Sequence, residues 1–224
     1  MTTLNEIADA APAGTPADAR FPASQYAEAG NYFDDYAGEL TRALSSIRRA
    51  DIEKAAEILI DAYTYGACVF SCGNGGSASI ANHLQCDHVK NVGNGTDLSP
   101  RVMSLVANVE TITAIANDHA YEDIFARQLQ SQARSGDVLL VISSSGRSAN
   151  IVRALAWARD NGLRTIALTG FGGGDARKLA EVAIHVDCTN YGVVEDLHQT
   201  IMHALAQYIR QSRMAPDAVA TNVF

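Results

Sequence analysis

ACVFSCGNGGS, residues 67–77, carries the strongest structural signal in the chain. Its first five residues resemble a short buried strand, and three glycines follow before a helical pattern begins. Glycines here let the backbone bend tightly and turn free N–H groups toward an anion, and the dipole of the following helix adds attraction. The stretch therefore predicts a strand, a phosphate-sized turn and a helix. A tight turn without a ligand is the alternative, because glycines also simply make turns.

Four further apolar runs alternate with amphipathic stretches along the chain. Such alternation is typical of a parallel sheet covered by helices on both faces. The expected fold class is α/β, a doubly wound parallel sheet of about five strands, with ligands outside the carboxyl ends of the strands. The other expected strands are 101–107, 137–143, 164–170 and 182–187, and the expected helices lie near 76–90, 108–116, 121–133, 148–161, 175–181 and 194–212.

Two helices are expected before the first strand. The first begins near Ser24, and the second follows Asp51, whose side chain suits an N-cap. The helical spacing of the first is carried by Phe33, Tyr36, Leu40 and Leu44.

The domain organisation follows from length and local composition. The 224 residues suffice for one α/β domain and not for two of typical size. Residues 1–23 are small, polar and interrupted by proline, so a disordered arm is expected there. Residues 24–213 are expected to form the single domain, and residues 214–224 a flexible tail.

The charge balance excludes two classes of partner. A formal net charge of −8 argues against a protein that grips nucleic acid or an anionic membrane, since both need clustered Lys and Arg. The four cysteines show no paired framework, no run of 18 apolar residues is present, and the N-terminal residues do not resemble a signal peptide. A cytoplasmic location is expected, and an anionic ligand must be held by local groups.

A second candidate turn follows the expected strand at 137–143. It reads SSSGRS, residues 143–148, and leads into a helical pattern. Four hydroxyls beside a helix N-terminus can replace the hydration shell of a phosphate without a lysine. Two such turns on neighbouring strands predict that residues 74–77 and 143–148 together hold the phosphate group.

Two nucleotide-binding motifs are excluded. Gly73, Gly75 and Ala78 fit a loose dinucleotide fingerprint, but the acidic residue required about 20 positions later is missing. No Lys-Ser or Lys-Thr pair follows the glycines, which excludes a nucleotide P-loop.

The two turns, together with IANDHAYEDIF (115–125) and ALTGFGGG (167–174), resemble the sugar-isomerase (SIS) domain family and its phosphoheptose isomerase branch. The similarity extends from about residue 40 to residue 212. It implies the SIS fold and conversion of sedoheptulose 7-phosphate to an aldoheptose 7-phosphate. It also implies a homotetramer with active sites where subunits meet, and often a bound zinc ion.

The resemblance also transfers individual residues. The metal-binding residues of the family correspond to His83, Asp87, Glu195 and His203, with Glu in the family at position 87 and Gln at position 195. At position 192, where the family has an Asp that helps the substrate, this chain has Gly192. The expected substrate contacts are Asn74, Gly75, Gly76, Ser77, Asp87, Asn117, Asp118, Ser143, Ser144, Ser145, Ser148 and Glu195.

The expected chemistry is aldose–ketose isomerisation. This reaction needs a base that removes a proton beside a carbonyl and an acid that moves protons between two oxygens. We expect Asp87 to be the base and His203 its acid partner, with zinc polarising the substrate oxygens. His83 lies four residues before Asp87 on one helix face. This spacing alone favours a solvated surface pair, but the glycine turn directly upstream reverses that preference. Glu195 and His203 lie about 12 Å apart along a regular helix, so a shared ion needs an irregular helix start or a second subunit.

Three other functions remain open at this stage. A non-catalytic SIS protein could bind a sugar phosphate or a partner, as the replication-initiator-associating protein of this branch does. Such proteins lack the catalytic carboxylate and the histidine of the last helix, whereas this chain has Asp87 and His203. Another phosphosugar isomerase and an etherase acting on phosphorylated amino sugars are the other two. The remaining histidines, expected to be structural or on the surface, are His88, His119, His185 and His198.

Overall fold

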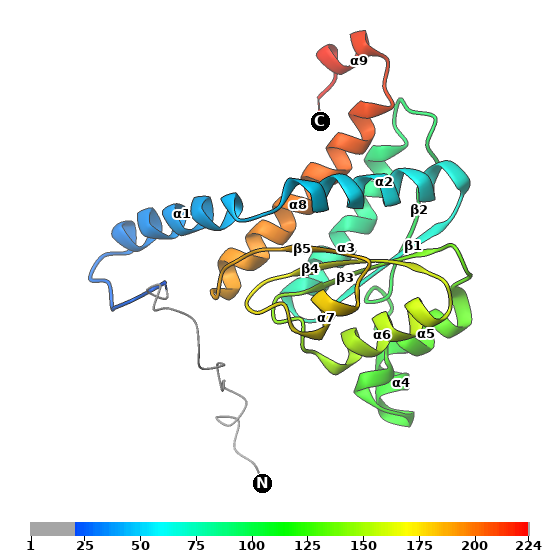
Figure 1. The fold of residues 1–224 in the computed structure, drawn as a ribbon, viewed down its shortest axis with the longest axis horizontal. Coiled ribbons are helices and arrows are strands. Elements are labelled where there is room, and N and C mark those ends of the chain that lie inside the picture. The colour runs from blue at the N-terminus through cyan, green and yellow to red at the C-terminus, as the bar shows by residue number, and fades with distance from the viewer. Residues whose placement is uncertain (1–20, 224) are drawn as a thin grey trace.

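The computed structural model describes residues 21–223. Its centre is one sheet of five parallel strands in the order β2-β1-β3-β4-β5, and this confirms the predicted doubly wound α/β fold (Figure 1). Each strand begins within one residue of its predicted start. The strands are β1 Cys68–Gly73, β2 Arg101–Ser104, β3 Val138–Ser143, β4 Arg164–Thr169 and β5 Val182–His185.

Helices cover both faces of the sheet (Figure 1). Successive strand residues point to opposite faces, so Val69 joins the core under one layer and Phe70 the core under the other. β1 and β3 are buried at every position. One layer contains α2 Arg49–Tyr65, α3 Gly76–Asp87 and α8 Tyr191–Ser212, and the other contains α4 Val109–Asp118, α5 Ala126–Gln132, α6 Ala149–Asp160 and α7 Gly174–Leu179.

The strand order determines where a ligand can bind. β2 lies on one side of β1, whereas β3 lies on the other, so the chain reverses its winding direction between β1 and β3. In doubly wound sheets of this order, the crevice outside the carboxyl ends of these two strands is the usual ligand site. The glycine turn follows β1 and the serine loop follows β3, so both predicted loops lie at this point.

Asp137 aligns these two strands at their other end. Its side chain is buried, with Oδ1 accepting from the Cys68 N–H at 2.7 Å and Oδ2 from the Arg134 N–H at 2.8 Å. Its own carbonyl accepts from the Arg164 N–H that begins β4. Asp137, which precedes β3, therefore connects to the start of β1 through its carboxylate and to the start of β4 through its backbone carbonyl.

The N-terminal helices differ in detail from the prediction. α1 spans Ala29–Ser45, about five residues after the expected start, because Glu28 is extended and provides no side-chain cap. Asp51 as N-cap of α2 was wrong, since the helix begins at Arg49. Asp51 lies instead in the first turn, where it accepts from Arg48 and complements the helix dipole.

Three short helical segments complete the described chain. A π-helical turn, His88–Val92, continues α3, and a 3₁₀ turn, Tyr121–Asp123, follows α4. The segment 214–224, expected as a flexible tail, contains the helix α9 Pro216–Thr221. The expected arm at 1–23 lies mostly outside the described residues. Nowhere within 21–223 is there a helix long and apolar enough to cross a membrane, and the cytoplasmic location stays a prediction.

Candidate active site

Reciprocal hydrogen bonds join the glycine turn to the helix that follows the serine loop. The Asn74 amide donates to the Asn150 side-chain oxygen at 3.0 Å, and the Asn150 amide donates back at 2.8 Å. Tyr121 donates its hydroxyl to the same Asn74 oxygen at 3.0 Å. Asn74 was predicted to contact the substrate, but its side chain mainly holds the two loops in register.

The serine loop keeps some hydroxyls for structure and leaves others available. The Ser143 hydroxyl accepts from the Gly146 N–H at 3.2 Å, and Ser145 accepts from Arg147. The Ser144 hydroxyl is buried and has no hydrogen-bond partner among the described residues. Ser148 is the N-cap of α6 and makes no side-chain capping bond. Because a buried polar group is costly without a partner, Ser144 supports a ligand that completes this loop.

A third loop locks the serine loop in place. Gly146 has a φ of +65°, and a Cβ built there would overlap the backbone of Gly173. The Gly170 N–H donates to the Ser144 carbonyl at 2.8 Å, and the Ala176 N–H donates to the Gly146 carbonyl at 3.0 Å. Gly146 and Gly174, the last residue of ALTGFGGG, are therefore required for this close approach of two backbones.

Two helices form the other wall of the site. The start of α3 contacts the start of α8, where Gly76 lies beside Glu195. Further along both helices, Asp87 lies beside His203. The helices therefore run side by side in the same direction (Figure 1). Their facing polar side chains lie one turn apart, because residues four apart on a helix share a face.

A cluster of three predicted metal-binding residues lies between these helices. The distance between His83 Nε2 and Asp87 Oδ1 is 3.4 Å, and that between His203 Nε2 and Asp87 Oδ2 is also 3.4 Å. The two imidazole rings are edge to face, with centroids 4.9 Å apart. One ligand atom from each of the three residues lies within 4.8 Å of the others. Two imidazoles and one carboxylate form a donor set that zinc accepts, so the residues fit a divalent ion.

Glu195 lies outside this cluster. α8 is already regular at this residue, so no irregular helix start brings its carboxylate down to His203. The carboxylate lies instead against Gly76, where a Cβ would overlap it, at the N-terminus of α3. Burial raises the pKa of the Glu195 carboxyl above its ordinary value, and the Asp196 carboxylate raises it further. A carboxylate already occupies this helix end, so we expect a second anion, the substrate phosphate, to bind at the serine loop instead.

The remaining predicted residues have separate positions. Ser77 is buried in the first turn of α3. Asn117 and Asp118 are exposed at the end of α4, joined by a 2.8 Å hydrogen bond, three residues before the Tyr121 that contacts Asn74. The other histidines lie outside the cluster. His88 and His198 are fully buried, and burial lowers the pKa of each to about 4.

Sequence reasoning missed three residues of the site. Asn150 and Tyr121 hold Asn74, and the amide of Gln199 contacts both histidines of the cluster. Only Gln199 had a sequence signal. It lies four residues after Glu195 and four before His203, so the three side chains share one helix face.

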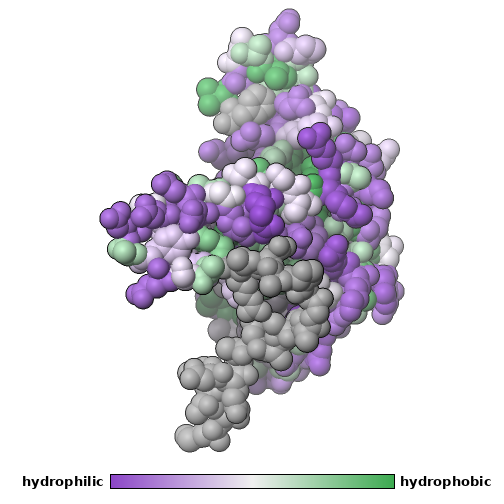
Figure 2. All heavy atoms as spheres, turned by 60° about the vertical axis from the view of Figure 1, so that its left-hand side comes forward, coloured by the Kyte–Doolittle hydropathy of each residue, from purple (hydrophilic) through white to green (hydrophobic). Residues whose placement is uncertain are grey.

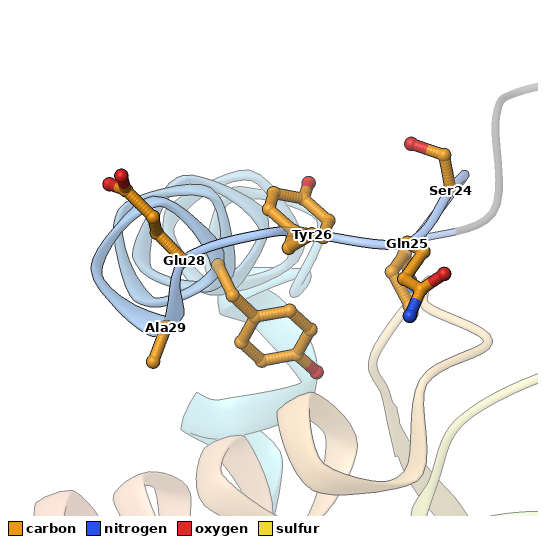
Figure 3. A pocket seen from close by; sticks show the side chains of 7 residues that line it. Ser24, Gln25, Tyr26, Glu28 and Ala29 are labelled. Atoms are coloured by element: carbon orange, nitrogen blue, oxygen red, sulfur yellow. The ribbon is translucent and has the colours of Figure 1, made fainter.

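A hollow of about 420 Å³ lies beside the N-terminus of α1 and contains none of the predicted site residues (Figure 3). Most of the surface that lines it is apolar, and its only carboxylate is that of Glu28. It is therefore not the candidate site. The lining residues are Pro22, Ser24, Gln25, Tyr26, Glu28, Ala29 and Tyr32.

Comparison with known proteins agrees with this geometry. Residues 31–170 match the model of the SIS domain. A phosphoheptose isomerase from Akkermansia muciniphila is 38% identical over 174 residues, which cover 76% of this chain and 89% of that protein. The chain belongs to the SIS domain family, in its phosphoheptose isomerase branch. A phosphoheptose isomerase from Mycobacterium tuberculosis is also 38% identical, over 70% of this chain and 80% of that protein.

Solved structures confirm the SIS fold. A phosphoheptose isomerase from Neisseria gonorrhoeae superposes with a TM-score of 0.73 and 28% identity, covering 81% of this chain and 96% of that one. A phosphoheptose isomerase from Francisella tularensis gives a TM-score of 0.72 and 30% identity over the same shares. The predicted family and fold class are both confirmed.

The raised pKa of Glu195 in this SIS domain predicts a dependence of stability on pH. The pKa of this carboxyl is higher in the folded state than in the unfolded state. As pH rises between these two pKa values, the unfolded state loses the proton first, so folding becomes less favourable. Glu195→Gln removes this penalty. The variant should melt at a higher temperature than the parent chain at neutral pH, with little gain below the ordinary glutamate pKa of about 4.3.

Thermal melts at several pH values check this expectation. Glu53→Gln, at an exposed position on α2, controls for the loss of one negative charge. Equal gains for the two variants at neutral pH, or a gain for Glu195→Gln that does not depend on pH, would contradict the assignment.

Proposed function

We propose that the protein is an aldose–ketose isomerase that converts sedoheptulose 7-phosphate to D-glycero-D-manno-heptose 7-phosphate. The observation that carries the proposal is the cluster of His83, Asp87 and His203, placed on helices that begin at or lie beside the phosphate-sized turn. Relatives that cover most of the chain are phosphoheptose isomerases, which supports the same reaction.

The cluster can perform the proton transfers that this isomerisation requires. The Asp87 carboxylate takes a proton from C1 of the ketose and returns it to C2 of the resulting enediol. His203 gives a proton to the oxygen on C2 and takes one from the oxygen on C1. One C–H and one O–H bond break and one of each forms, so the product is an isomer and no co-reactant is needed.

The position of Asp87 suits this role. Its side chain is largely buried, with one oxygen facing His83 and the other facing His203. One oxygen can therefore be oriented by an imidazole while the other faces a proton donor. The aspartate is one methylene shorter than the glutamate expected in this family, so the substrate must approach α3 more closely, because a misplacement of about 1 Å can lower a rate about 100-fold.

We propose zinc as the divalent ion of this site, held by His83, Asp87 and His203. The combination of two imidazoles with a carboxylate favours zinc over calcium or magnesium, which prefer oxygen ligands alone. A bound zinc ion would polarise the carbonyl and hydroxyl oxygens between which the proton moves. With the Nε2 lone pair of His203 held by the ion, this polarisation would replace the proton transfer that His203 provides in the metal-free site.

The phosphate is proposed to lie at the serine loop. The free Ser144 hydroxyl, the Ser148 hydroxyl and the N-terminus of α6 provide donors without a cation. These uncharged donors let a protein of net charge −8 bind an anion, and the loop also contains one exposed cation, Arg147. A non-catalytic role in binding sugar phosphate would use the same loop but would not need the cluster of Asp87 with two histidines.

Substitution of the proposed base tests the reaction. Asp87→Asn keeps the shape of the side chain but cannot take the proton, so kcat should fall by about 100-fold or more. Turnover of sedoheptulose 7-phosphate by metal-replete protein can be followed by NMR. Asp61→Asn, at an exposed position on α2, is the matched control and should keep the parent kcat. Parent-like turnover by Asp87→Asn would exclude Asp87 as the base.

We also propose that the protein is a homotetramer. α1 projects from the body of the molecule (Figure 1). On the face shown in Figure 2, hydrophobic residues lie among hydrophilic ones. Of the apolar stripe predicted for α1, Tyr36 and Leu40 pack against the core, whereas Phe33 is 68% exposed and Leu44 is 44% exposed, so the chain leaves two of the four residues uncovered. Apolar surface of this kind is typical of an interface between subunits.

Light scattering tests the assembly. The mass in solution should be four times the 23.8 kDa of one chain. Phe33→Glu should lower it by placing a charge in the interface, and Phe33→Leu should keep the parent mass. A monomer at micromolar concentration, or an assembly that Phe33→Glu leaves intact, would contradict this role of α1.

A further inference from the structure

The side chain of Gln199 lies between the two histidines of the cluster. Its amide nitrogen is 3.1 Å from His83 Nδ1 and 2.9 Å from His203 Nε2. Gln199 is one turn before His203 on α8 and is half-buried. No other described side chain makes a hydrogen bond to both of these imidazoles.

The amide takes the place that a cation would take. Its NH₂ group has two N–H donors, and each points to a ring nitrogen that must offer a lone pair to accept it. An imidazole can bind a metal ion through either ring nitrogen. Gln199 faces His203 through Nε2, which also faces Asp87, and faces His83 through Nδ1, the nitrogen that does not face Asp87. Because amide nitrogen and oxygen exchange places by rotation about the last side-chain bond, the oxygen can face the same point when an ion is present.

The spacing of the donor atoms fits a shared ion. Ligands bound tetrahedrally at about 2.1 Å lie about 3.4 Å from one another. The two contacts of Asp87 with His83 and His203 are each 3.4 Å. The terminal nitrogen of Gln199 lies 2.9 Å from His203 Nε2, the same ring nitrogen that lies 3.4 Å from Asp87. Its 3.1 Å contact with His83 is to Nδ1, whereas Asp87 faces Nε2 of that ring, so a shared ion would bind His83 through one of these two nitrogens.

We propose that Gln199 is the fourth protein ligand of the divalent ion and binds it through the amide oxygen. This inference rests on the metal site of the proposed function and assigns a ligand that the resemblance placed at Glu195. A neutral amide leaves the site with a net charge of +1 around a divalent ion, whereas a second carboxylate would cancel it. Zinc in catalytic sites also expands to five-coordination, which leaves room for a substrate oxygen.

The assignment also gives Glu195 a separate place. Glu195 lies one helical turn before Gln199, against Gly76 at the start of α3. It therefore faces the glycine turn, while Gln199 faces the histidines. One face of α8 thus carries the carboxylate of Glu195 near the glycine turn, then the amide of Gln199, then the imidazole of His203.

Cobalt(II) binding tests the ligand directly. Full-length protein is stripped of metal with a chelator and titrated with Co²⁺, and both affinity and the visible absorption bands are recorded. Gln199→Met keeps the length of the side chain and removes the oxygen. The Gln199→Met substitution should weaken Co²⁺ binding by about 100-fold and shift the absorption bands. Loss of a residue that only hydrogen-bonds a ligand can lower affinity by a similar ~10–100-fold, but it leaves the set of ligands unchanged, so the bands decide between the two roles.

Three controls make the result specific. Gln199→Glu keeps an oxygen at this position and should restore tight binding. Glu195→Gln should leave affinity and bands as in the parent chain. Gln130→Met, at an exposed position on α5, controls for the substitution itself.

Two outcomes would overturn the inference alone. In the first, Gln199→Met keeps the parent bands, whatever its affinity, which would make Gln199 only an orienting hydrogen-bond partner. In the second, Glu195→Gln loses the bands instead. If the parent chain binds neither Co²⁺ nor Zn²⁺, the proposed metal site fails as well, and the NMR assay of turnover reports separately on the isomerase.

Discussion

Backbone hydrogen bonds between β1 and β3 are the constraint on which the site depends. The pairing runs from Val69 opposite Val138 to Gly73 opposite Ile142, so the two chains leave the sheet side by side at the same edge. The glycine turn and the serine loop are then neighbours by topology, and the Asn74–Asn150 pair fixes their register. Without parallel pairing of these strands, 70 residues of sequence would separate the two loops and no phosphate site would exist.

The same constraint positions the reacting groups. The glycine turn starts α3 directly above the sheet, so α3 must pack beside α8, and the polar faces of both helices meet along their length. The result is a gradient of charge across the site. Hydroxyls, N–H groups and the exposed Arg147 lie in the serine loop, where the phosphate is proposed, while the carboxylates of Asp87 and Glu195 lie along the two helices. An acidic protein can bind an anion in this way because it presents the anion with local dipoles rather than net charge.

The fold could be predicted from the sequence because its signals are local. Apolar runs followed by GNGG or SSSG specify a strand, a turn and a helix within a dozen residues, and the strand starts agreed within one residue. His83 and Asp87 could be paired because they lie four apart on one helix. Asn150 could not be assigned, because Asn74 lies 76 residues away and only the packing of the loops brings them together. The helical spacing of Gln199 with His203 could be read from the sequence, but not its contact with His83, 116 residues away. The N-cap of α2 failed for a related reason, since an Asp near a helix start suits the first turn as well as the cap.

A crystal structure of the zinc-loaded protein with sedoheptulose 7-phosphate tests the central claim most directly, because it locates both ends of the substrate in one measurement. The account predicts that phosphate oxygens accept hydrogen bonds from the Ser144 and Ser148 hydroxyls. It predicts C1 and C2 between Asp87 and His203, with Glu195 still beside Gly76. A phosphate bound at the hollow beside α1, or a sugar whose C1 and C2 lie away from Asp87, would contradict it.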